Sequence, residues 1–273
     1  MPAARAAAPA PAQDPVAPRV GLAIVTPPGV ELGRDGARYV GELVALVARS
    51  MGLAPEALEG RAFSDPAAAA QMIASTRDCF VLGSLGFFAA HRASLDLVPL
   101  LGLKRADGAP ERYRVVVKKG RFESLAALRG RSLAGSPLFE SPRFIDLAVF
   151  DGALSAATSF TLTPTSRPLR EVRRLASEKV DAVLLDGAQF ASLAALPLFE
   201  SLAVVHTSAP LPSLGLMARG GARVKALTPR MIEAAEGLCA SGEGRSLCQS
   251  FGIAGFEKVD AAAIQAFVER LGQ

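Results

Sequence analysis

Three acidic side chains stand where a predicted strand gives way to a helix: Asp65, Glu140 and Asp186. In an open α/β sheet, ligands bind beyond the carboxyl ends of the strands, so these carboxyl groups could converge on one cleft. Asp65 could equally serve only as a helix cap, because aspartate before Pro66 is a typical helix start. Asp186 ends the apolar strand predicted over 180–185, where a charge needs a partner or a cleft.

Cysteine and histidine supply few other candidates for chemistry. Cys79 and His91 could be drawn as a nucleophile and its base, but their sequence separation says nothing about geometry. Cys79 also precedes the apolar run 80–82, which favours a buried, small hydrophobic side chain. Because His91 and His206 are the only histidines, we expect no Cys/His zinc site. The sequence also lacks a P-loop, a dinucleotide fingerprint and a G-x-S-x-G elbow, so no cofactor and no catalytic residue is predicted.

The composition indicates a folded protein that does not bind nucleic acid. Half of the 273 residues are hydrophobic and 21% are charged, which supplies ample apolar surface for a core. The 30 basic residues nearly balance the 26 acidic ones and are scattered, whereas a nucleic-acid binder concentrates charge on one face. Cys239 and Cys248 are close enough for a disulfide in an oxidising compartment, or they are two unrelated thiols.

Residues 1–18 contain eight alanines and five prolines without apolar periodicity, which predicts a disordered linker. Such a tether often follows an exported or lipid-anchored N-terminus. It has no continuous apolar region of a signal peptide, and no run in the chain approaches membrane-spanning length. The composition therefore favours an exported protein whose signal or lipoprotein leader is absent from this chain, with a cytosolic protein as the alternative.

The chain alternates predicted strands and helices in two blocks, which indicates an α/β fold. The strands of the first block are predicted over 20–25, 60–64 and 79–82, and those of the second over 132–135, 159–162 and 180–185. Extended segments near 100–118 and 203–218 separate the blocks, and three helices near 229–239, 243–251 and 260–271 finish the chain. We therefore predict two lobes joined by two crossing strands with a cleft between them: lobe A from 19–105 and 213–273, and lobe B from 106–212.

Two consecutive segments carry a resemblance to a known family. Tyr-Arg-Val-Val-Val-Lys-Lys at 113–119 and Ser-Leu-Ala-Ala-Leu-Arg-Gly-Arg-Ser-Leu-Ala at 124–134 resemble the hinge strand and the following segment of type II periplasmic solute-binding proteins. They are most similar to the phosphonate/phosphate branch that serves ABC transporters. Segments 63–66, 81–84 and 179–186 agree, so the resemblance covers about 19–260. It implies a periplasmic, monomeric, non-enzymatic protein whose partners are a small-molecule or lipid ligand and a membrane transporter component.

The anion-binding residues of that family are largely missing here. The family binds anions at helix N-termini of the second lobe, a suitable phosphate cradle. The corresponding segment here, 136–142, keeps Ser141 but places Glu140 where it would repel an anion. Pro66 replaces an expected tyrosine and an expected histidine is absent near 166–167, whereas Asp186 matches an acidic family position.

The same corners carry apolar side chains, which predicts a more apolar cavity, although ordinary core packing explains these residues as well. An apolar or amphipathic ligand, such as a lipid or sterol, is therefore favoured slightly over a phosphonate. The predicted ligand-binding residues are Thr26, Ser64, Asp65, Gly83, Ser84, Phe87, Leu138, Phe139, Glu140, Ser141, Asp186 and Gln189.

The leading hypothesis is a carrier that captures its ligand between two lobes and delivers it to a membrane transporter. The alternative is a small-molecule lyase or other enzyme on the same fold, which would use Asp186 or Cys79. A ligand-sensing domain is a third possibility, but it needs a partner domain that this chain lacks.

Overall fold

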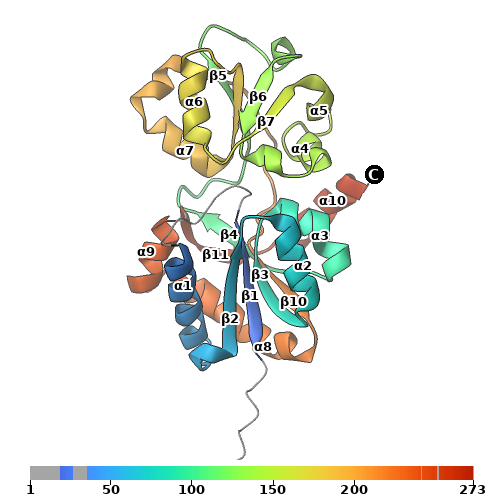
Figure 1. Cartoon of the computed structure of the whole chain (residues 1–273), viewed down its shortest axis with the longest axis vertical. Coiled ribbons are helices and arrows are strands. Elements are labelled where there is room, and N and C mark those ends of the chain that lie inside the picture. Colours follow the sequence, from blue (N-terminus) through green and yellow to red (C-terminus); the bar gives the residue numbers. More distant parts are fainter. Residues whose placement is uncertain (1–18, 27–35, 241, 251, 273) are drawn as a thin grey trace, which may run out of the picture.

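The computed structural model describes residues 19–26, 36–240, 242–250 and 252–272. They form two α/β lobes, each built on one sheet with helices against its faces (Figure 1). We call the lobe with the six-stranded sheet lobe A and the lobe with the five-stranded sheet lobe B. The predicted linker 1–18 lies outside the described residues.

The sheet of lobe A combines parallel strands from the start of the chain with antiparallel strands from its end. Its order is β11-β4-β10-β3-β1-β2, and β1 pairs in parallel with β2 and β3. Strands β10 and β11 both run antiparallel to β4. The strands are β1 (Val20–Val25), β2 (Leu58–Phe63), β3 (Asp78–Leu82), β4 (Val98–Arg105), β10 (Leu216–Gly220) and β11 (Ile253–Lys258). The helices are α1 (Gly36–Ser50), α2 (Pro66–Ser75), α3 (Leu85–Leu95), α8 (Ala222–Leu238), α9 (Gly242–Ser250) and α10 (Ala261–Gly272), with the 3-10 turn η1 (Pro55–Ala57).

Lobe B repeats this plan with fewer strands, in the order β7-β6-β8-β5-β9. Strand β6 is parallel to β7 and β8, and β5 is antiparallel to β8 and β9. The strands are β5 (Arg114–Lys118), β6 (Ser132–Gly135), β7 (Thr161–Pro164), β8 (Ala182–Leu185) and β9 (Leu202–Thr207). The helices are α4 (Pro142–Ala148), α5 (Ala156–Ser159), α6 (Pro168–Ala176) and α7 (Gly187–Ala194), with 3-10 turns η2 (Ala126–Leu128), η3 (Pro137–Phe139) and η4 (Pro197–Ser201).

The chain crosses between the lobes twice, after β4 and after β9, as the sequence predicts. The two crossings lie side by side, because Glu111 and Leu211 form an antiparallel bridge between them. We call these paired crossings the hinge, because segments of this kind can let two lobes move against each other.

The largest apolar cluster is continuous from lobe A into lobe B. Helix α10 packs against α4, where Phe267 meets Phe144 edge to face with ring centroids 5.7 Å apart. Both rings are nearly inaccessible to solvent, so the last helix of lobe A holds one side of lobe B in this conformation. The C-terminal helix lies beside the gap between the lobes in Figure 1.

Several details of the C-terminal region correct the sequence-based expectation. The helix predicted to start near residue 229 begins at Ala222 and continues through Pro229, because Val224 in its first turn is buried against lobe A. Strand β11 was not predicted at all, since its burial alternates only weakly and its partner β4 lies about 150 residues earlier in the chain. Cys239 and Cys248 form a disulfide, which decides between the two alternatives.

Candidate ligand-binding cleft

One hydrogen bond joins the two lobes at the corners that the sequence singles out. Ser84 is the N-cap of α3: its hydroxyl oxygen accepts from the backbone N–H of Phe87 at 2.9 Å. The same hydroxyl donates to Oε1 of Glu140 in lobe B at 2.8 Å. A helix begins at Ser84 because serine satisfies one of the N–H groups that the first turn leaves unpaired.

The carboxylate of Glu140 lies directly against the first turn of α3. A Cβ atom added to Gly86 would stand 2.2 Å from Oε2 and 2.6 Å from Oε1 of Glu140, so only a glycine allows this approach. The N-terminus of a helix carries a partial positive charge, which favours a carboxylate there. Burial nevertheless raises the pKa of Glu140 above its usual value, and the hydrogen bond from Ser84 lowers it in part.

In lobe B, Asp186 and Gln189 form a capping box at the start of α7. The Asp186 carboxylate accepts from the N–H of Gln189 at 2.8 Å, and Oε1 of Gln189 accepts from the N–H of Asp186 at 3.4 Å. The side-chain amide of Gln189 also donates to Oγ of Ser136, at 2.6 Å, which links the corner after β8 to the corner after β6. Burial raises the pKa of Asp186 to about 6.

A second carboxylate at this helix comes from the hinge. Oε1 of Glu111 accepts from the N–H of Gly187, the first residue of α7, at 2.7 Å. Its Oε2 pairs with Nη1 of Arg105 at 3.1 Å, and Arg105 also binds Asp107. A Cβ atom on Gly187 would lie 2.5 Å from Nη1 of Arg105, so the guanidinium lies directly against this glycine. Three elements therefore meet at this point: the end of β4, the first crossing and the start of α7.

Tyr113, at the end of the first crossing, lies among these acidic groups. Its backbone N–H donates to Oγ of Ser208 on the second crossing at 2.9 Å, which ties the two crossings together. Burial raises the pKa of its phenol well above the usual value. The negative charges of Glu140, Glu111 and Asp186 raise it further, which shows that all three lie within electrostatic reach of Tyr113.

The remaining corner residues of lobe A occupy less central positions. The Thr26 hydroxyl donates to the carbonyl of Phe63 at 3.1 Å, and Thr26 is buried. Asp65 is exposed and caps α2 by accepting from the N–H of Ala67 at 2.9 Å, so its capping role is present. Ser64 is exposed beside it, and the N–H of Gly83 donates to the carbonyl of Gly215 at 2.9 Å. None of these contacts reaches lobe B.

The apolar candidates divide into core and surface. Phe87 and Leu138 are buried in the cluster that spans the two lobes, and Phe87 lies 4.7 Å from the ring of His91. Phe139 is 37% exposed, and Ser141 caps α4 by accepting from the N–H of Phe144 at 3.2 Å. The structure thus shows a packing role for Phe87 and Leu138. A role of these four residues in ligand binding stays a prediction.

Four residues of this region were not among the predicted site residues: Arg105, Glu111, Tyr113 and Ser136. Their local sequence carried a signal, since Tyr113 is one of two tyrosines and Glu111 lies in the predicted crossing. The sequence did not show that these residues lie together, because Glu111 and Gly187 are hydrogen-bonded but are 76 positions apart in the chain.

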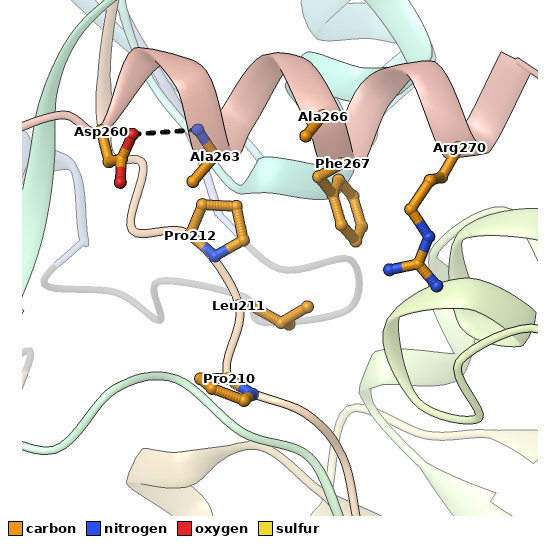
Figure 2. A pocket seen from close by; sticks show the side chains of 8 residues that line it. All are labelled: Pro210, Leu211, Pro212, Asp260, Ala263, Ala266, Phe267 and Arg270. Atoms are coloured by element: carbon orange, nitrogen blue, oxygen red, sulfur yellow. Dashed lines mark hydrogen bonds between the residues drawn. The ribbon is translucent and has the colours of Figure 1, made fainter.

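A pocket of about 340 Å³ lies at a different place, between the second crossing and α10 (Figure 2). Pro210, Leu211 and Pro212 form one wall and Phe267 and Arg270 the other. The guanidinium of Arg270 pairs with Asp151 of lobe B. No predicted site residue lines this pocket, so it is separate from the contact between Ser84 and Glu140.

The structure disfavours Cys79 as a catalytic nucleophile. Its side chain is fully buried in β3, its thiol donates to the carbonyl of Phe80 at 3.1 Å, and burial raises its pKa to about 11. A protonated, inaccessible thiol is inert. Within the part of the chain that the structure describes, no group of three or more His, Cys, Asp or Glu side chains is placed to hold a metal ion. Among the described helices, none has both the length and the apolar character needed to cross a bilayer.

The protein has two α/β lobes joined by two crossings, and the first turn of α3 in lobe A contacts Glu140 of lobe B. This is the architecture of a type II periplasmic binding protein, as predicted. The family model described as "ABC transporter, phosphonate, periplasmic substrate-binding protein" matches residues 40–264, and the chain belongs to this family. No curated protein matches the chain.

Solved structures with the same fold support this assignment. XAC2383 from Xanthomonas citri, bound to chloride, has a TM-score of 0.70 and 18% identity, covering 93% of this chain and 97% of its own. A binding protein component of an ABC phosphonate transporter (PA3383) from Pseudomonas aeruginosa has a TM-score of 0.67 and 13% identity over 93% and 88%. PhnD1 from Prochlorococcus marinus, in complex with methylphosphonate, has a TM-score of 0.68 and 11% identity over 94% and 98%. At these identities the likeness shows the fold and not the ligand.

Proposed function

We propose that this protein captures a small molecule between its two lobes in the periplasm and presents it to a membrane ABC transporter. The observation that carries the proposal is the hydrogen bond from Ser84 to Glu140, which joins strand-to-helix corners of opposite lobes. A ligand that contacts both corners would stabilise the closed arrangement, and the two crossings would supply the hinge. The lobe boundaries at 105/106 and 212/213, and a monomeric state, are part of this proposal.

The class of ligand is a separate part of the proposal. A lipid or sterol-like ligand was predicted from the apolar corners, but Phe87 and Leu138 are used for packing inside the protein. Phe139 is the one apolar candidate with substantial exposure. Support for a lipid therefore rests on Phe139 alone.

The proposal is tested by native mass spectrometry of protein purified from its own periplasm, combined with small-angle scattering. A ligand retained at one copy per chain, with a smaller radius of gyration than the stripped protein, is the expected result. Conversion of the retained molecule into a product on incubation would instead favour the enzyme alternative. A radius of gyration that no retained or added compound changes would refute ligand-driven closure.

A further inference from the structure

The acidic side chains of the candidate cleft together set its charge. Glu140 lies against the first turn of α3, and Glu111 accepts from the first N–H of α7. The N-termini of α3 and α7, two of the helix N-termini that an anion could use, are therefore each contacted by a carboxylate of the chain itself. Asp186 adds a third carboxyl group, and all three act on the same phenol, that of Tyr113.

The arginines beside these carboxyl groups are already engaged. Arg105 lies between Asp107 and Glu111, which leaves this trio with a net negative charge. Arg112 donates to the carbonyl of Ser208 at 2.7 Å. Arg114 stacks on the ring of Phe190, with its Cζ 4.4 Å from the ring centroid. These contacts hold the guanidinium groups in the hinge and against lobe B, where none of them contacts Glu140.

We propose that the cleft selects against anions, that Glu140 is the residue that determines this, and that the ligand is a cation or an uncharged hydrogen-bond donor. The inference rests on the proposed binding function and departs from the phosphonate in the family's description. An anion approaching α3 would have to displace the Glu140 carboxylate from Ser84 and then lie beside it. Two like charges about 4 Å apart repel each other strongly in a partly desolvated site. A donor ligand meets the opposite situation, because carboxylates accept hydrogen bonds.

The pKa directions agree with this geometry. Burial raises the pKa of Glu140, and it raises that of Asp186 to about 6, so the charged form of each carboxyl group is held at a cost in free energy. A bound cation or donor would lower that cost by pairing with the charged form, whereas a bound anion would increase it.

The test compares the affinity of the protein and of Glu140→Gln for methylphosphonate and inorganic phosphate, by isothermal titration calorimetry at pH 7.5. Glutamine keeps the shape and can still accept from Ser84, but it removes the charge. The expected result is at least about a tenfold tighter binding of either anion by Glu140→Gln than by the unchanged protein. For the neutral diester dimethyl methylphosphonate, the difference in affinity between the two proteins should be much smaller.

Two further variants complete the design. Glu140→Asp keeps the charge and should exclude anions as the unchanged protein does. Glu200→Gln removes one negative charge at an exposed position in η4, away from Glu140, and should leave the affinity for either anion unchanged. The proposal is overturned if the unchanged protein binds methylphosphonate as tightly as Glu140→Gln does, or if Glu140→Gln gains affinity for neither anion. Failure of the carrier function would be recognised separately, by the absence of any retained ligand and of any closure in scattering.

Discussion

Replacing Gly86 by alanine should open the two lobes without weakening the fold of either one. In the closed arrangement the new methyl group would lie 2.2 Å from Oε2 and 2.4 Å from Cδ of Glu140, well inside contact distance. The carboxylate must therefore leave, and its hydrogen bond with Ser84 is lost. In the open arrangement the methyl group meets no partner from lobe B, and alanine is a better helix former than glycine.

The size of the effect follows from the contact that is lost. A hydrogen bond to a charged group contributes about 1.5–3 kcal/mol, and the exposure of Ser84 reduces this to about 1–2 kcal/mol. The ratio of closed to open protein should then fall by roughly 5- to 30-fold. The unfolding free energy of lobe A should stay constant or rise by up to about 0.5–1 kcal/mol, because alanine restricts the unfolded chain.

Small-angle scattering measures closure as the radius of gyration, and urea unfolding measures stability on the same samples. Gly41→Ala is the matched control, because Gly41 also lies within a helix, α1, and an added Cβ there meets nothing within 4 Å. The control should gain the helix stabilisation without any change in radius. If Gly86→Ala stays as compact as the control, Glu140 does not hold the lobes together and the reasoning is refuted.

Three further perturbations have defined outcomes. Because burial raises the pKa of Asp186 from 3.8 to about 6, the folded state binds its proton more tightly than the unfolded state does. As the pH rises from about 4 to about 6, the unfolding free energy of the protein should fall by up to about 3 kcal/mol relative to that of Asp186→Asn, measured by urea titration. The same pH dependence in both proteins would contradict this. Replacing both Cys239 and Cys248 by serine opens a short loop and should cost about 2.5 kcal/mol, measured by chemical unfolding; an effect below about 0.5 kcal/mol would show that the bridge is not formed in solution. Phe267→Ala removes the ring that packs on Phe144 and should cost about 3–5 kcal/mol, measured by thermal unfolding.

A surface variant provides the control for Phe267→Ala. Leu169 in α6 is 47% exposed, so Leu169→Ala should change stability by less than about 0.5 kcal/mol. Equal losses in Phe267→Ala and Leu169→Ala would contradict the view that α10 ties lobe A to lobe B.

Much of the fold could be read from local patterns. Apolar runs such as Val20–Val25 and Ala182–Leu185 predict buried strands, because a strand covered on both faces must be apolar throughout. Asp65 before Pro66 and Ser141 before Pro142 predict helix starts, because the cap and the proline act within one turn. The position of the two crossings follows from where this alternation breaks.

The elements that escaped prediction depend on distant partners. Strand β11 forms because it pairs with the free edge of β4. Helix α8 continues through Pro229 because its first turn packs on the sheet of lobe A. A local pattern carries no information about such partners, so propensity alone is overridden.

For the cleft, the sequence by itself placed Ser84, Glu140 and Asp186 at strand-to-helix corners and marked Glu140 as unfavourable for an anion. Only the tertiary structure decided that Glu140 contacts Ser84, which lies 56 positions away, and that Glu111 and Arg105 join Asp186 at α7. It also placed Phe87 and Leu138 in the core. The physical reason is that the identity of a side chain sets its chemistry, whereas its partners are set by how two lobes meet.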